Sequence, residues 1–219
     1  MRPELASLRA AYTDLAEIAL SLNEADSWCG TGCPGWSARD LFVHLLGDAQ
    51  RALVALGTPA NRPADRTAST YWIDSPGQED PESRGLRSVR TMAAAWRLDY
   101  LTATYAETTR AVLTLAERCD AESVVATQGH ALRVGDFLDT LTVEAGLHHL
   151  DLLVGVNRPG PKGEVLATIR RTLEGLLGHP APAVFDDLTW ARIGSGRKVI
   201  SAADRIALGP DADRFPLIK

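Results

Sequence analysis

The sequence has 219 residues, of which 45% are hydrophobic, and it carries a formal net charge of −5. This length and composition support one substantial core, or a main domain with a small appendage, and leave little room for two large domains. The 28 acidic and 23 basic residues form no dense block of like charge, which argues against nucleic acid or a charged membrane surface as a partner.

The first 22 residues have an apolar rhythm, but it is interrupted by Glu4, Arg9, Asp14 and Glu17. A signal peptide has an uninterrupted apolar region instead. No run elsewhere approaches the roughly 18 apolar residues of a membrane span. We therefore expect a cytoplasmic protein that does not interact with membranes.

The cysteines Cys29, Cys33 and Cys119 form an odd set, which argues against a disulfide framework and fits a reducing compartment. Three residues separate Cys29 from Cys33, one more than in a CxxC motif. No second Cys/His pair follows at zinc-finger spacing, so we interpret these cysteines as buried or loop thiols rather than as ligands of a structural zinc ion.

Two long helices are predicted in the first part of the chain. Apolar residues recur at helical spacing over residues 3–22. The glycines and the proline of residues 23–36 then predict a loop. Ser37, followed three residues later by Asp40, is a capping-box-like start for a second helix over residues 38–56.

Two more helices follow a long connection. Residues 58–83 contain four prolines and no sustained periodicity, which predicts a surface connection and a candidate lid. Residues 86–119 lack proline and glycine and keep an apolar stripe, so we expect one unbroken third helix. Residues 123–134 predict a short hairpin or an extended strand. Asp136 is expected to cap a fourth helix, which ends near Gly155. Four helices with one long crossing predict a mainly α fold, a four-helix bundle with a long crossover connection.

A small extension follows this bundle. Residues 157–163 have the composition of a linker, and residues 164–177 predict a fifth helix before shorter elements interrupted by proline and glycine. We place the helical bundle in residues 1–156, and the linker, fifth helix and C-terminal extension in residues 157–219.

A candidate metal site lies on the second and fourth predicted helices. Glu144 and His148 are four residues apart, so their side chains project from one helix face and both can reach one ion. The spacing is common by chance, and a solvated glutamate beside a surface or core histidine is the alternative. His44 lies among apolar residues, and a buried imidazole needs a partner. Either Asp40 or Asp48, one turn away on each side, could orient its ring, although a core histidine paired with Asp48 would show the same pattern.

Four other residues have more open roles. Asp151, three residues after His148, could fix the tautomer of that histidine or supply an oxygen ligand. His149 points about 100° away, so we expect a structural role for it. Trp36 is predicted to be mostly buried and to anchor its loop, with an aromatic wall for a thiol as the alternative. Arg197 lies in a Gly-Ser-Gly-Arg-Lys turn that could bind an anionic or oxygen-rich group, or could be an ordinary surface turn.

The segment Cys33–His44, together with Val134–Leu138 and Glu144–Asp151, resembles the mycothiol-dependent maleylpyruvate isomerase N-terminal domain family. That family belongs to the DinB-like four-helix metalloproteins, and the resemblance covers roughly residues 5–155. It implies a DinB-like bundle in residues 1–156.

By this resemblance, the metal ligands are His44, Glu144 and His148. Zn²⁺ is the expected ion, with another divalent transition metal as the alternative, and mycothiol or a similar thiol is the implied cosubstrate. Three protein ligands would leave a position open for the thiol, and Arg197 is our candidate contact for this cosubstrate.

The resemblance implies a metal-dependent enzyme that activates the thiol for transfer, conjugate addition or addition-elimination isomerisation of a small electrophilic substrate. The extension is short for the family's second domain, so maleylpyruvate is not assigned as the substrate. A metal-dependent hydrolase and a non-catalytic metal-binding helical module are the alternatives, and a homodimer is kept as a hypothesis.

Overall fold

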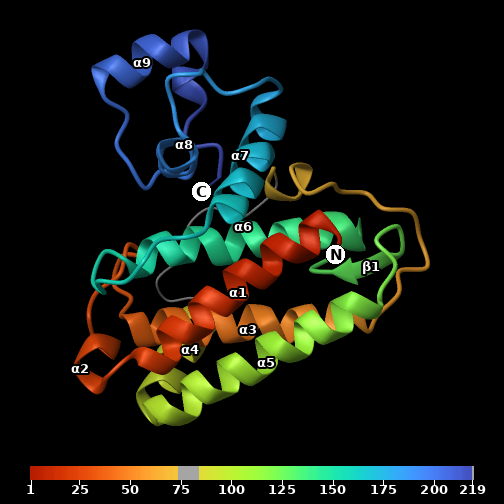
Figure 1. The fold of residues 1–219 in the computed structure, drawn as a ribbon, viewed down its shortest axis with the longest axis vertical. Helices are drawn as coiled ribbons and strands as arrows, with labels where there is room; N and C mark the ends of the chain where they lie inside the picture. Colours follow the sequence, from red (N-terminus) through yellow and green to blue (C-terminus); the bar gives the residue numbers. More distant parts are fainter. Residues whose placement is uncertain (74–83, 219) are drawn as a thin grey trace.

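The computed structural model describes residues 1–73 and 84–218. Four long helices form a bundle, and Figure 1 shows them as α1 (Pro3–Ser21), α3 (Ala38–Leu56), α5 (Leu98–Arg118) and α6 (Val134–Leu152). In this bundle α1 contacts both α5 and α6, and α3 also contacts both. The predicted mainly α, DinB-like bundle with a long crossover between the second and third bundle helices is confirmed.

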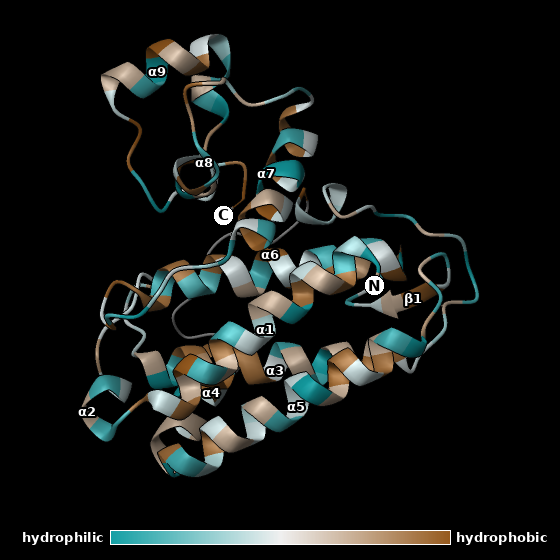
Figure 2. Ribbon diagram, in the orientation of Figure 1, coloured by the Kyte–Doolittle hydropathy of each residue, from teal (hydrophilic) through white to brown (hydrophobic). Residues whose placement is uncertain are grey.

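Helices α1, α3 and α5 turn an apolar side inward, whereas α6 is buried on most of its surface because it also packs against α7 (Gly163–Leu177). Figure 2 shows hydrophobic and hydrophilic residues alternating along α1, α3 and α5. Leu8, Leu41, Leu101 and Leu138, one from each bundle helix, are fully buried. Burial of one such side chain contributes about 1.5–3 kcal/mol. The core therefore fixes α3 and α6 against one another before any polar contact is considered.

The predicted third helix is divided into two, α4 (Arg84–Ala95) and α5. The backbone of Arg97 is extended, with φ −67° and ψ 144°. The buried Arg39 guanidinium donates a 2.6 Å hydrogen bond to the carbonyl of Trp96, which a continuous helix would have used. The expectation of one helix over residues 86–119 was wrong because this long-range bond leaves no trace in local periodicity.

The start of α3 agrees with the sequence pattern. Ser37 N donates to Asp40 Oδ2 at 2.8 Å, and Asp40 N donates to Ser37 Oγ at 3.2 Å, which completes the capping box. The predicted loop over residues 23–36 contains an additional short helix, α2 (Glu24–Ser27), whose first turn is capped by Asn23.

Residues 123–134 form the predicted hairpin, with β1 (Val124–Thr127) antiparallel to β2 (His130–Arg133). The two turn residues, Gln128 and Gly129, have φ values of 47° and 84°, the left-handed conformation that a tight hairpin turn requires. Arg133 then precedes α6 directly.

Asp136 does not cap α6, contrary to our expectation. The helix begins at Val134, and the Asp136 carboxylate accepts the amide of Ala68 at 2.9 Å instead. Asp136 thus anchors the long connection, which also contains a short 3₁₀ turn over Thr70–Trp72. The candidate lid over residues 58–83 extends into positions outside the described residues.

The C-terminal extension begins with α7 (Gly163–Leu177), which agrees with the predicted fifth helix and packs on α6 and α1. Gly146 on α6 permits this approach, because a Cβ there would lie 2.7 Å from Val165 Cγ1. Beyond α7 lie α8 (Asp187–Gly194) and α9 (Ala202–Leu208), at the top of Figure 1.

Trp190 on α8 is fully buried between the rings of Phe185 and Phe215, which gives this extension an aromatic centre. Among the described residues, no helix combines the length and the hydropathy needed to cross a bilayer.

Candidate metal centre

Helices α3 and α6 bring together His44, Glu144 and His148. The Nε2 atoms of both histidines lie 3.3 Å from Glu144 Oε1. One potential ligand atom from each residue lies within 4.8 Å of the other two. The four-residue spacing on α6 places Glu144 and His148 on one face, and the packing of α3 brings His44 opposite them. All three residues expected to be ligands are therefore neighbours, and each remains partly exposed.

Glu144 contacts both rings through Oε1, and these contacts favour its ionised form. Burial alone would raise the pKa of this carboxyl group, but hydrogen bonds with His148 and His44 hold the pKa well below its usual range. Two imidazole nitrogens beside an ionised carboxylate form a donor set suited to divalent transition metals.

Asp48 adds a second carboxylate at the same place. Its Oδ2 lies 3.1 Å from His44 Nε2, the nitrogen that also faces Glu144. This oxygen is buried and has no hydrogen-bond partner among the described residues. Asp48 therefore faces the space between the ligands rather than the back of the His44 ring, while Asp40 is used by the helix cap. A cation would compensate this unpartnered oxygen, so the residues present fit a bound metal ion.

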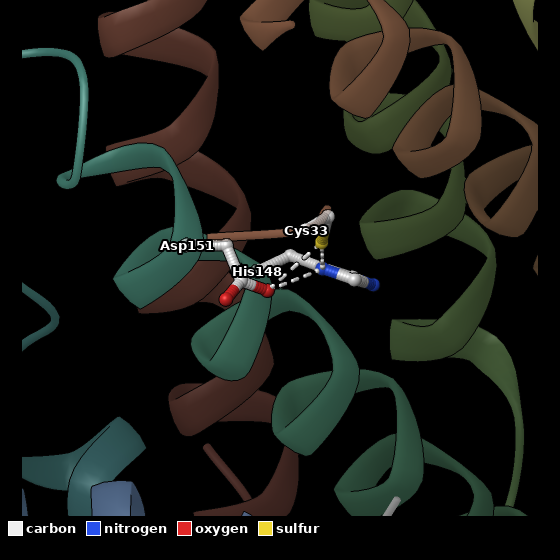
Figure 3. A group of neighbouring side chains, drawn as sticks. All are labelled: Cys33, His148 and Asp151. Carbon is white, nitrogen blue, oxygen red and sulfur yellow. Dashed lines mark hydrogen bonds and ion pairs between the residues drawn. The ribbon is translucent and has the colours of Figure 1, made fainter. Parts of the chain in front are cut away.

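The opposite nitrogen of His148 is bound by Asp151. His148 Nδ1 lies 2.9 Å from Asp151 Oδ2, and the Cys33 thiol donates to the same oxygen at 3.3 Å. Figure 3 shows Cys33 and Asp151 gathered at one ring nitrogen of His148, with the second nitrogen directed away from both. Of the two roles predicted for Asp151, this geometry favours orientation of the ring over direct ligation in the His44 group.

Arg197 also binds Asp151. Its Nε lies 2.9 Å from Oδ1 and its Nη2 lies 2.6 Å from Oδ2, a two-point ion pair with a side chain that is only 3% exposed. Burial alone would raise the pKa of Asp151, but hydrogen bonds with His148 and Arg197 lower it to about 2. The Nε and Nη2 groups of Arg197 both donate to Asp151 in this structure. Contact between Arg197 and a cosubstrate stays a prediction.

A second group of potential ligands, Cys33, His148 and Asp151, also has ligand atoms within 4.8 Å of one another. A cation there would have to displace the Arg197 guanidinium from Asp151 and would meet its positive charge. The group containing His44 is therefore the better candidate for a metal site. The sequence predicts Cys33 as a buried or loop thiol, and its contact with a carboxylate 118 positions away has no local sequence signal.

Trp36 lines the candidate site. It is half-buried, and its ring meets the His44 ring edge-on with the centroids 5.3 Å apart. Its side chain packs against the core, as expected for a residue that anchors its loop, and it also borders the proposed ligands. His149, by contrast, is buried, and its Nε2 contacts the Pro159 carbonyl at 2.9 Å, in agreement with the structural role predicted for it.

These features define a helical bundle that presents two histidines and a glutamate between neighbouring helices. The sequence profile described as "Mycothiol maleylpyruvate isomerase N-terminal domain" matches residues 8–153, and the chain belongs to this family.

A solved structure with a similar fold is the "mycothiol-dependent maleylpyruvate isomerase H52A mutant". The two chains share 14% identity with a TM-score of 0.57, and the alignment covers 83% of this chain and 75% of the other. At this identity the likeness shows the fold alone. No curated protein matches the sequence.

Proposed function

We propose that this protein is an enzyme that binds one divalent metal ion, with Zn²⁺ expected, through His44, Glu144 and His148, and uses it to activate a thiol related to mycothiol. The observation that carries the proposal is the convergence of three potential ligand atoms within 4.8 Å. Membership of a family named for a mycothiol-dependent isomerase supports the choice of thiol. The reaction class is transfer, conjugate addition or addition-elimination isomerisation of a small electrophile.

When bound, a divalent cation favours the thiolate form of a coordinated thiol at neutral pH. The residues of this chain set up that chemistry. His44 and His148 both direct Nε2 toward Glu144 Oε1, and Trp36 forms an aromatic wall beside His44.

Asp48 is the proposed acceptor for a proton or hydrogen bond from the cosubstrate, because its buried Oδ2 makes no hydrogen bond among the described residues and lies beside the proposed ligands, 3.1 Å from His44 Nε2. Asp151 keeps the proton of His148 on Nδ1, so that Nε2 is free to bind metal. None of the residues given a role here needs to form a covalent bond to the substrate, because the proposed nucleophile is the thiol of the cosubstrate.

The decisive experiment measures thiol dependence in zinc-loaded protein. Mycothiol and a small electrophile, monobromobimane, are supplied together and separately, with His44→Ala as the control that removes a proposed ligand. Thiol-dependent conjugation above the uncatalysed rate that disappears in His44→Ala supports the proposal. An ester such as p-nitrophenyl acetate is assayed separately without thiol. Its zinc-dependent hydrolysis would favour the hydrolase alternative, and tight zinc binding with neither activity would favour a non-catalytic module.

Substitution of the metal offers a second test that does not depend on the choice of electrophile. Addition of mycothiol to the cobalt-substituted protein should produce thiolate-to-cobalt charge-transfer absorption. Absence of this absorption at saturating thiol would show that the sulfur does not reach the metal.

A further inference from the structure

The ion pair between Arg197 and Asp151 links the C-terminal extension to the bundle. Asp151 lies in the last turn of α6, and Arg197 lies in the turn that follows α8. The two residues are 46 positions apart, and both oxygens of the buried carboxylate receive a guanidinium N–H. Such a two-point pair fixes the plane of the carboxylate as well as its position.

One oxygen of this carboxylate serves Arg197 and His148 together, besides accepting a hydrogen bond from the Cys33 thiol at 3.3 Å. Asp151 Oδ2 lies 2.6 Å from Arg197 Nη2 and 2.9 Å from His148 Nδ1. Once Arg197 has fixed the carboxylate, only one orientation of the His148 ring keeps its Nδ1 contact. That orientation directs Nε2 toward Glu144 Oε1, 3.3 Å away.

The turn that carries Arg197 is itself anchored. Lys198 N donates to the Arg192 carbonyl at 3.0 Å, and Leu217 N donates to the Gly194 carbonyl at 2.8 Å. The Arg197 side chain is 22% exposed, against 40% for Lys198 beside it. Arg197 is therefore held by backbone bonds on one side and by Asp151 on the other, as a fixed part of the fold.

We propose that Arg197 is a positioning residue of the metal centre, acting through Asp151 on His148, so that the C-terminal extension completes a site whose ligands all lie in the bundle. The inference rests on the proposed metal site. It assigns Arg197 a role different from direct contact with a cosubstrate. The two N–H groups that could bind a carboxylate of the cosubstrate, on Nε and Nη2, already bind Asp151.

The test compares zinc affinity in full-length variants by competition with a chromophoric chelator. Arg197→Ala should weaken zinc binding by roughly 10- to 100-fold, the usual effect of removing a partner that orients a ligand. Arg197→Lys should recover only part of this loss, because an ammonium group cannot make the two-point contact. Lys198→Ala is the matched control, since Lys198 pairs with Asp204 and not with Asp151, and it should behave as the wild type.

A spectroscopic readout separates positioning from a general loss of stability. The ligand-field absorption of the cobalt-substituted protein should change in Arg197→Ala and not in Lys198→Ala. Since Arg197→Ala leaves the Asp151 charge buried without its cation, the Arg197→Ala/Asp151→Asn double variant removes that charge and provides a folded form if the single variant unfolds. The double variant should also show weakened zinc binding.

The outcomes distinguish the positioning role of Arg197 from the proposed metal site on which it rests. If the wild type binds no zinc, or His148→Ala binds zinc as tightly as the wild type, the proposed metal site is wrong. If His148→Ala loses zinc while the folded Arg197 variants keep the wild-type affinity and cobalt spectrum, the positioning role alone is overturned. A raised thiol requirement at unchanged zinc affinity would also overturn it and would return Arg197 to cosubstrate recognition.

Discussion

The imidazole rings of His44 and His148 meet edge-on, with centroids 4.8 Å apart and an interplanar angle of 81°. They come from residues more than one hundred positions apart, on helices that the core already holds together. Each ring faces the same Glu144 oxygen through Nε2. The bundle thus preforms the approach of two nitrogens to one point.

We predict that His44→Ala and His148→Ala each lose nearly all bound metal while keeping the helical content of the wild type. The bundle core supplies most of the folding energy outside the site, so the fold should survive loss of the ion. Elemental analysis and circular dichroism measure the two quantities. His130→Ala, a histidine on β2 that contacts Asp65, is the control and should retain its metal. Full metal retention in both of the first two variants would reject the ligand set.

Gly32→Ala should disturb the contact between Asp151 and His148. A Cβ at Gly32 would lie 2.5 Å from Asp151 Oδ1, whereas a Cβ at Gly30, in the same loop, would meet nothing within 4 Å. We expect Gly32→Ala to lower the free energy of unfolding by about 1–3 kcal/mol, the usual cost of overpacking, and to weaken zinc binding. Gly30→Ala should do neither. Urea unfolding and chelator competition test this, and equal behaviour of the two variants would contradict the close packing.

Trp36 should report on the occupied site. Its ring lies beside His44, so binding of cobalt should quench the fluorescence of the wild type through this residue. Trp36→Phe should lose most of the quenching, while Trp28→Phe should retain it, because Trp28 is an exposed residue paired with Glu24 on α2. Strong quenching that persists in Trp36→Phe would place the metal nearer to another tryptophan.

The partly buried carboxyl of Asp139 predicts a pH-dependent loss of stability. Burial raises its pKa to about 6, Arg171 opposes this shift, and the negative charges of Glu4 and Asp136 add to it. The protonated form is therefore favoured by folding, and stability present below the unfolded pKa of about 4 is lost as the pH rises through about 6.

Asp139→Asn removes this ionisation. After allowance for partial exposure, it should raise the free energy of unfolding by about 1–2 kcal/mol above pH 7 and have little effect near pH 4. Urea unfolding at the two pH values measures the difference. A stabilisation of the same size at both would show that the ionised carboxyl carries no penalty.

Much of the fold follows from local patterns. Helical spacing predicted α1, α3 and α7, and the Ser37–Asp40 pattern predicted the start of α3, because helix formation and capping depend on residues three or four apart. Glu144 and His148 could be proposed as ligands for the same reason, because they lie four residues apart on α6. The break between α4 and α5 could not be predicted this way, since it coincides with a hydrogen bond from Arg39, 57 positions away.

The contacts that Asp151 makes beside the candidate site could not be predicted from the sequence either. Asp151 could be associated with His148 because they share a helix face, but its pairing with Arg197 depends on how α7 and α8 return the chain to the end of α6. Cys33 reaches the same carboxylate from a loop whose path is not periodic. Proximity created by tertiary packing, rather than residue type, made these contacts unpredictable.

The late position of Arg197 in the chain has a consequence for biosynthesis. Because translation proceeds from the N-terminus, His44, Glu144 and His148 are synthesised before Arg197. The nascent bundle can therefore assemble while Asp151 still lacks its cation. Folding of the last segment then neutralises a buried negative charge. Under the proposed positioning role of Arg197, a metal ion that arrives early would meet a loosely held His148, and the final affinity would be reached only when translation has supplied the guanidinium.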